Sequence, residues 1–287
     1  MYSPQWIDLD GVANMRDLGG LPTETGETVQ PRRLLRSGNL LNLSPEAIET
    51  LVTHYGVTDV VDLRTHVELA KEGDGPLRAL EHIRHHHHTL YREDSIESGI
   101  PAAERALPWE ADERREAATP EGGTVPKRGT VPDGSGEVGR RRSHEEFWSE
   151  HYLSYLSTRP DSIVAALDAI ASSSGAAIVH CAAGKDRTGT VVGLALKVVG
   201  VSDELVIADY AASAERVPAI MARLRSSTAY AANLQDKTVA QQSPTTDTMR
   251  LLLTALEERH GGVLGWLGGQ GWTEADTYRL RRKLLAD

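Results

Sequence analysis

A single cysteine and an arginine six positions after it are the residues of this chain best suited to covalent chemistry. Cys181 is the only cysteine among 287 residues, and the segment 176–189 reads Ala-Ala-Ile-Val-His-Cys-Ala-Ala-Gly-Lys-Asp-Arg-Thr-Gly. The apolar residues before Cys181 predict a buried strand, and the apolar positions at 191–196 predict a helix after the loop. A lone cysteine is usually an inert buried residue. The residues that surround Cys181 favour a different interpretation.

The loop that follows Cys181 has the composition of an anion-binding site. Ala182, Ala183 and Gly184 have small side chains, so backbone N–H groups between a strand and a helix can turn toward a ligand. The helix dipole favours negative charge at the same place. Arg187 offers a planar guanidinium for two phosphate oxygens, and the positive field favours a Cys181 thiolate. We therefore expect the sulfur to attack phosphorus and form a phosphocysteine, which water then hydrolyses.

The decapeptide 180–189 resembles the His-Cys-x5-Arg-Ser/Thr signature of the protein tyrosine phosphatase superfamily. Its ending, Gly-Lys-Asp-Arg-Thr-Gly, resembles the bacterial branch of broad-specificity phosphatases, some of which also act on phosphoinositides. The resemblance implies an α/β fold of three layers, in which helices flank a central, mainly parallel sheet. It implies a phosphatase in which Cys181 is the nucleophile and Arg187 binds phosphate and stabilises the transition state. We expect neither a cofactor nor a metal ion.

The other residues of the decapeptide are expected to hold the substrate or to shape the loop. Lys185 adds positive charge at the rim, and Thr188 can hydrogen-bond the sulfur. His180 is expected to orient the loop through backbone hydrogen bonds, the alternative being a structural buried histidine. The expected substrate-binding set is Ala182, Ala183, Gly184, Lys185, Thr188 and Gly189, of which the two glycines permit the turn and close helix packing.

The sequence offers several carboxylates as the general acid that protonates the leaving group. A phenolate leaves with modest help, whereas an alkoxide leaving group must be protonated. Asp186 is certain to lie near the phosphate, but two adjacent cations and the helix dipole favour its ionised form. Asp94 follows Tyr91-Arg92-Glu93, where the superfamily usually carries its acid on a mobile loop. We favour Asp186 over Asp94, and Asp62 comes third.

A second match to the same bacterial phosphatases lies near the N-terminus. Residues 14–20 read Asn-Met-Arg-Asp-Leu-Gly-Gly, and 36–38 read Arg-Ser-Gly. Turn-forming residues between them predict a hairpin-like segment. The resemblance places this segment on the active-site side. Whether Arg16 or Arg36 touches substrate stays open.

Two further patterns lie at the end of the predicted strand 57–63 and in a later segment, 85–88. Asp62 and Arg64 fall at its carboxyl end, where open α/β sheets place ligand sites; an ion pair that ties the strand to the next loop is an equal alternative. Residues 85–88 are four adjacent histidines. On a strand, alternate histidines share a face, which could form a metal pair. A histidine-rich sheet edge is the interpretation we favour.

The remaining sequence predicts one domain, 1–287, with an insertion at about 100–142. Within it, residues 101–118 are charged and could form a poorly anchored helix, and residues 119–140 are rich in Gly, Pro, Thr and Glu and poor in large apolar residues. This composition favours a flexible, disordered excursion over a lid. Residues 217–243, also poor in large apolar side chains, are expected to lie over the site as a cover.

Composition narrows the function classes. Apolar residues make up 40% of the chain, and no run approaches the ~18 residues of a membrane span. One cysteine fits a reducing, cytoplasmic compartment, and the net charge of −10 argues against nucleic-acid binding. The expected partner is a phosphorylated protein or a phosphoinositide. Two alternatives are a rhodanese-like sulfurtransferase and a phosphate-binding pseudoenzyme that acts as an interaction module.

Overall fold

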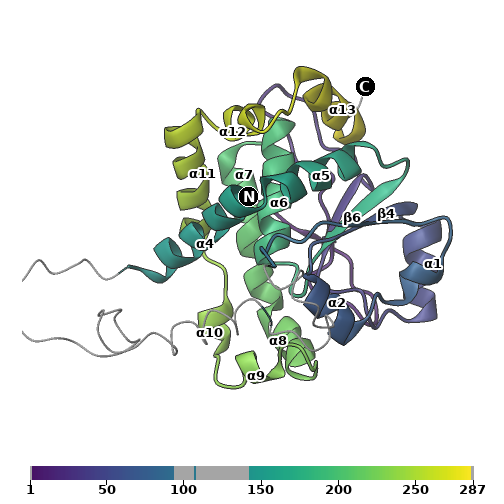
Figure 1. Cartoon of the computed structure of the whole chain (residues 1–287). Coiled ribbons are helices and arrows are strands. Elements are labelled where there is room, and N and C mark those ends of the chain that lie inside the picture. The colour runs from purple at the N-terminus through teal and green to yellow at the C-terminus, as the bar shows by residue number, and fades with distance from the viewer. Residues whose placement is uncertain (1, 94–106, 108–141, 286–287) are drawn as a thin grey trace, which may run out of the picture.

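The computed structural model describes residues 2–93, 107 and 142–285, and a mixed sheet lies at its centre (Figure 1). Across the sheet the strands of the described chain are β1 (Gln5–Trp6), β2 (Arg16–Asp17), β3 (Leu34–Ser37), β6 (Ala176–His180), β4 (Val57–Asp62) and β5 (Arg84–His87). The last four run parallel, whereas β1 and β2 pair antiparallel with their neighbours. The predicted, mainly parallel sheet is confirmed.

Helices cover both faces of this sheet. One face carries α4 (His144–Thr158), α5 (Pro160–Ala171), α6 (Asp186–Val198), α7 (Asp203–Ala212), α11 (Thr246–His260), α12 (Val263–Gly269) and α13 (Glu274–Leu284). The other face carries α1 (Pro45–Thr53). Beyond the carboxyl ends of the strands lie α2 (His66–Glu72), α8 (Val217–Arg225), α9 (Ala231–Leu234) and α10 (Val239–Gln242).

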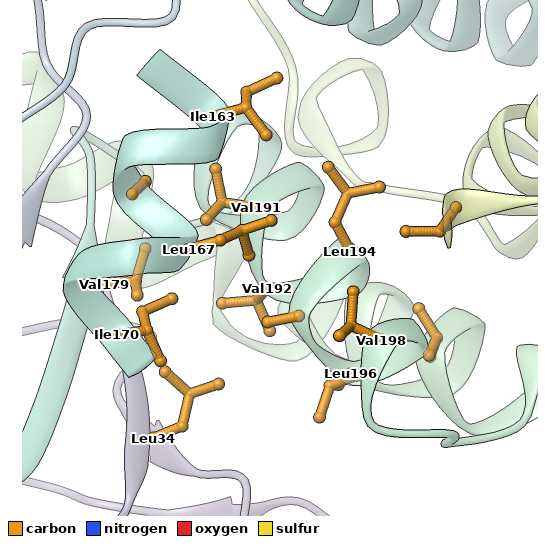
Figure 2. Packing of buried hydrophobic residues seen from close by; sticks show 14 of the residues in the cluster. Leu34, Ile163, Leu167, Ile170, Val179, Val191, Val192, Leu194, Leu196 and Val198 are labelled. Carbon is orange, nitrogen blue, oxygen red and sulfur yellow. The ribbon is translucent and has the colours of Figure 1, made fainter. Parts of the chain in front are cut away.

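The central strand β6 is buried on both faces. Ala177 and Val179 belong to the larger apolar cluster, which contains α5 and α6, while Ala176 and Ile178 belong to the cluster on the α1 face. Figure 2 shows Val179 beside side chains of α5 and α6. A strand whose alternate residues enter two cores lies in the middle layer of three. The predicted three-layer class is therefore confirmed.

Local sequence signals place most of the helices. Ser44 caps α1, with Pro45 in its first turn, and capping boxes begin α4 at Ser143 and α13 at Thr273. The sequence pattern did not predict helices at α2, α8, α9, α10 and α12. None of the helices in the described ranges is long and apolar enough to cross a membrane. The predicted insertion at about 100–142 lies outside the described residues except for positions 107 and 142.

Candidate active site

The Cys181 loop joins the end of β6 to the first turn of α6. Cys181 is 2% exposed, and its Sγ accepts a hydrogen bond from the Gly184 N–H at 3.3 Å. Arg187 lies in the first turn of α6 and is 6% exposed. The sulfur thus lies beside a backbone donor at the positive end of a 13-residue helix. This arrangement stabilises an anion.

Two loop positions require glycine for different reasons. Gly184 has φ +67°, and an added Cβ would stand 2.2 Å from the carbonyl oxygen of Ser37. At Gly189 an added Cβ would stand 2.8 Å from Cδ2 of Tyr210. Gly184 therefore permits the turn and the close approach to β3, and Gly189 permits α6 to pack against α7.

Side chains of the N-terminal motif hold the Cys181 loop by donating hydrogen bonds to the backbone carbonyl groups of the loop. Asn14 Nδ2 donates to the carbonyl oxygens of Ala183 at 3.1 Å and Gly184 at 2.9 Å. Arg36 Nη2 donates to the Gly184 oxygen at 2.9 Å, and Arg16 Nη1 orients Asn14 by donating to its Oδ1 at 2.7 Å. Because these side chains bind the loop carbonyls, the loop N–H groups are left for other acceptors.

Both arginines of this motif are buried and share one carboxylate. Arg16 and Arg36 are 0% exposed, and both pair with Asp209 of α7, Arg16 Nε at 2.7 Å. Burial alone would raise the pKa of Asp209, but the charges of Arg16 and Arg36 outweigh it and lower the pKa to about 2. Both side chains are thus held by Asp209, Arg16 also bonds to Asn14, and Arg36 also bonds to the loop carbonyl of Gly184.

Arg187 is held by a glutamate that the sequence did not single out. Its Nη1 donates to Glu68 Oε2 at 2.6 Å and its Nη2 to Glu68 Oε1 at 2.8 Å. Glu68 is 0% exposed and forms a capping box with Thr65 at the start of α2. Burial would raise the pKa of Glu68, but the charge of Arg187 outweighs it and lowers the pKa below its ordinary value. The pair is therefore ionised, as a buried bidentate pair must be to persist.

One edge of the Arg187 guanidinium remains available. Glu68 occupies the edge formed by Nη1 and Nη2, and Nη1 also donates to the Leu63 carbonyl oxygen at 3.3 Å. Nε has no recorded partner within the described part of the chain. The edge formed by Nε and Nη2 carries two parallel N–H bonds, spaced for two oxygens of one phosphate.

Helix α4 presents aromatic side chains to Lys185 and Asp186. The Lys185 ammonium lies over the Trp148 ring, 5.5 Å from its centroid. One turn further on, the Tyr152 hydroxyl donates to Asp186 Oδ1 and lies 2.8 Å from the Tyr210 hydroxyl. Asp186 Oδ2 is 3.6 Å from the Lys185 ammonium, and its side chain is 21% exposed. Lys185 and Asp186 are thus both in contact with one face of α4.

The same face of α4 reaches Arg187 through another tyrosine. The Tyr155 hydroxyl donates to the Tyr91 hydroxyl at 3.2 Å. The Arg187 guanidinium carbon lies 5.3 Å from the centroid of the Tyr91 ring, within range of a cation–π interaction. Positions 148, 152 and 155 have the spacing of one helix face. Trp148 contacts Lys185, Tyr152 bonds to Asp186, and Tyr155 reaches Arg187 through Tyr91.

Helices α8 to α10 lie over the loop, as predicted for residues 217–243. Ala182 belongs to the same apolar cluster as Ile220 and Leu224 of α8. The Lys185 ammonium donates to the carbonyl oxygen of Gln242 at 2.6 Å. Thr188 is 0% exposed, and its hydroxyl has no hydrogen-bond partner among the described residues. The loop is therefore enclosed, and the Thr188 hydroxyl is free to bond to another group.

Asp62, Arg64 and His180 form a paired cluster beside the loop. Arg64 Nη2 donates to Asp62 Oδ2 at 2.7 Å, and His180 Nε2 lies 3.6 Å from the same oxygen. Burial would raise the pKa of Asp62, but His180 and Arg64 outweigh it, and the pKa lies well below its ordinary value. Burial lowers the pKa of His180 to about 4, and its Nδ1 is 3.3 Å from the Cys181 carbonyl oxygen. A carboxylate so paired is a poor proton donor.

The acidic residues after β5 include Asp94, the remaining candidate for the general acid in this region. Asp94 lies outside the residues that the structure describes. Its neighbour Glu93 accepts hydrogen bonds from the backbone N–H and from Nδ1 of His66, at 3.1 and 2.8 Å, at the start of α2.

The histidine-rich strand β5 lies at the edge of the sheet, where His86 bonds to Asp59 at 2.8 Å. Within the described ranges, no group of three or more residues of ligand type has the geometry of a metal site.

Comparison with known proteins identifies the family. The family model described as tyrosine phosphatase family matches residues 7–286. The chain belongs to the tyrosine phosphatase family. Triple specificity protein phosphatase PtpB of Mycobacterium tuberculosis is 30% identical over 297 residues, which cover 97% of this chain and 98% of that protein. A putative tyrosine-protein phosphatase of Cupriavidus necator is 29% identical over 210 residues, which cover 73% of this chain and 63% of that protein.

Membership of the tyrosine phosphatase family decides between the function classes left open by the sequence. The chain is a phosphoric monoester hydrolase of the protein-tyrosine-phosphatase type. The sulfurtransferase and the pseudoenzyme are set aside, because the family match spans nearly the whole chain. Sequence reasoning did not identify Glu68 or Tyr152 as parts of the site. For Glu68 a signal was visible, since Thr65-x-x-Glu68 is a capping-box pattern.

Proposed function

We propose that this phosphatase works through a phosphocysteine on Cys181. The thiolate attacks phosphorus, an S–P bond forms, and the P–O bond to the leaving group breaks as that oxygen takes a proton. Water then attacks phosphorus, the S–P bond breaks, and inorganic phosphate leaves with the thiolate restored. The observation that supports this proposal most strongly is the position of the Cys181 sulfur beside the Gly184 N–H, at the start of α6.

Arg187 and the loop would carry the charge of the transferring phosphoryl group. Glu68 leaves the Nε/Nη2 edge of Arg187 for two phosphate oxygens. The backbone N–H groups of residues 182–184 complete the cradle, and Lys185 adds charge at its rim. The buried Thr188 hydroxyl, which has no partner in the described chain, would donate to the sulfur and ease its departure in the second step.

We propose Asp186 as the general acid. It adjoins the loop, and its carboxylate is partly exposed. By contrast, Asp62 is tied to Arg64 and stays ionised. Asp94 remains the alternative donor, because the superfamily usually places its acid on the loop after the strand at that position.

For the substrate we propose phosphotyrosine, with phosphoserine, phosphothreonine and phosphoinositides as further substrates. The relative that covers almost the whole chain is named a triple specificity phosphatase, which supports a broad substrate range. A panel of phosphotyrosine, phosphothreonine and phosphoinositide substrates tests this range, and strict phosphotyrosine selectivity would overturn it. We also propose a reducing, cytoplasmic compartment, because the mechanism requires a reduced Cys181.

The Cys181→Ser variant tests the mechanism. Loss of p-nitrophenyl phosphate hydrolysis by the folded variant is expected, because an alcohol at this position is a far weaker nucleophile than a thiolate. Full activity of the variant would show that Cys181 is not the nucleophile.

A further inference from the structure

Residues 228–230, between α8 and α9, dock onto two acids of α2. The Tyr230 hydroxyl donates to Glu68 Oε1. The Thr228 hydroxyl and the Ala229 N–H donate to Glu72 Oε1 at 2.9 and 2.8 Å. Glu68 and Glu72 are four residues apart and thus lie on one face of the helix. A segment distant in sequence is therefore attached to the helix that holds Arg187.

Tyr230 completes the set of donors around the Glu68 carboxylate. Each Glu68 oxygen accepts one N–H of Arg187; Oε2 also accepts the Thr65 N–H at 2.6 Å, and Oε1 accepts the Tyr230 hydroxyl. Tyr230 is 6% exposed, and burial raises its pKa well above the ordinary value, so its hydroxyl keeps the proton that it donates. Without this hydroxyl, a buried carboxylate oxygen loses one of its donors.

We propose that Tyr230 is a positioning residue for Arg187. By fixing the Glu68 carboxylate from the side opposite Thr65, it sets the rotation of the guanidinium that Glu68 grips at two points. That rotation decides whether the Nε/Nη2 edge faces the phosphate. The inference rests on the proposed function, in which Arg187 binds the phosphoryl group.

The Tyr230→Phe variant removes the hydroxyl and keeps the ring. Because a displacement of about 1 Å at a catalytic group costs up to about 100-fold, we expect kcat/KM for p-nitrophenyl phosphate to fall about tenfold. Competitive inhibition by inorganic phosphate should weaken by a similar factor, since the same edge binds it. The rate of Cys181 alkylation by iodoacetamide should change less than twofold. Tyr278→Phe, at an exposed tyrosine of α13, is the matched control and should leave all three values unchanged.

A double-mutant cycle with Glu68→Gln separates this role from a general structural one. If Tyr230 acts through Glu68, adding Tyr230→Phe to Glu68→Gln should lower kcat/KM by less than about twofold further. Independent losses in the two variants, or a Tyr230→Phe enzyme with wild-type kcat/KM and phosphate inhibition, would overturn the proposal. Cys181→Ser, assayed alongside, keeps the two proposals apart. An inactive Cys181→Ser with an unaffected Tyr230→Phe refutes only the positioning role.

Discussion

Replacing Asp209 by Asn tests how the N-terminal arginines support the catalytic loop. The substitution keeps the side-chain volume but removes the one negative charge that Arg16 and Arg36 share. Two buried guanidinium groups would then face each other with an amide between them. Since Arg36 also holds the Gly184 carbonyl oxygen, both stability and activity should fall.

The size of the effect follows from the burial of this cluster. Breaking a buried ion pair by removing one partner costs about 3–5 kcal/mol, a large part of the roughly 5–15 kcal/mol that stabilises a typical domain. The pKa of Asp209 gives a second figure: lowering it from 3.8 to about 2 corresponds to roughly 2–3 kcal/mol at about 1.4 kcal/mol per pKa unit. Because the folded-state pKa is the lower one, this contribution is present above pH 3.8 and is lost as the pH falls through about 2.

Urea unfolding at several pH values measures both quantities. Asp209→Asn should lower the free energy of unfolding by about 3–5 kcal/mol at pH 7, with a smaller deficit near pH 2, where wild-type Asp209 is about half protonated. The control is Asp168→Asn, which breaks an exposed pair with Arg279 and should cost about 1 kcal/mol or less. Equal losses in the two variants would refute the view that Asp209 neutralises a buried pair of arginines.

Three other substitutions probe the loop and its carboxylates. Gly184→Ala should reduce kcat/KM for p-nitrophenyl phosphate at least about 100-fold, because a Cβ would lie 2.2 Å from the Ser37 oxygen; activity within tenfold of wild type would contradict this. Asp186→Asn should slow alkyl phosphates about 10²–10⁴-fold and aryl phosphates much less, as expected of a general acid, and equal losses across a leaving-group series would argue for another donor. Asp62→Asn should lower the melting temperature, since it leaves Arg64 without its buried partner, while the ratio of alkyl to aryl rates stays constant; a changed ratio would bring Asp62 back as the acid.

The cysteine loop was predictable because its parts are contiguous. Strand, small loop residues, cations and helix follow one another within 176–198, and the structure has β6 and α6 where the pattern placed them. The helix that begins at Pro45 and the edge strand that carries the histidines were also predictable, since capping residues and alternation are local signals.

The partners of the loop were not predictable, because they are distant in sequence. Glu68 lies 119 positions before Arg187, and Tyr230 lies 162 positions after Glu68. A capping box marks Glu68 as a helix start, but nothing local shows that its carboxylate is buried against an arginine. The role of Arg16 and Arg36 was undecided for the same reason, since Asp209, which pairs with both, lies on α7.

The covalent intermediate is the most direct test of the proposed mechanism. Wild-type enzyme mixed with p-nitrophenyl phosphate and quenched with acid within one turnover can be digested and analysed by mass spectrometry. The mechanism predicts that the peptide containing Cys181 gains the mass of one phosphoryl group, and that the Cys181→Ser enzyme forms no thiol-linked adduct. A phosphoryl group on another side chain, or turnover without any phosphorylated peptide, would contradict a cysteine-dependent phosphatase.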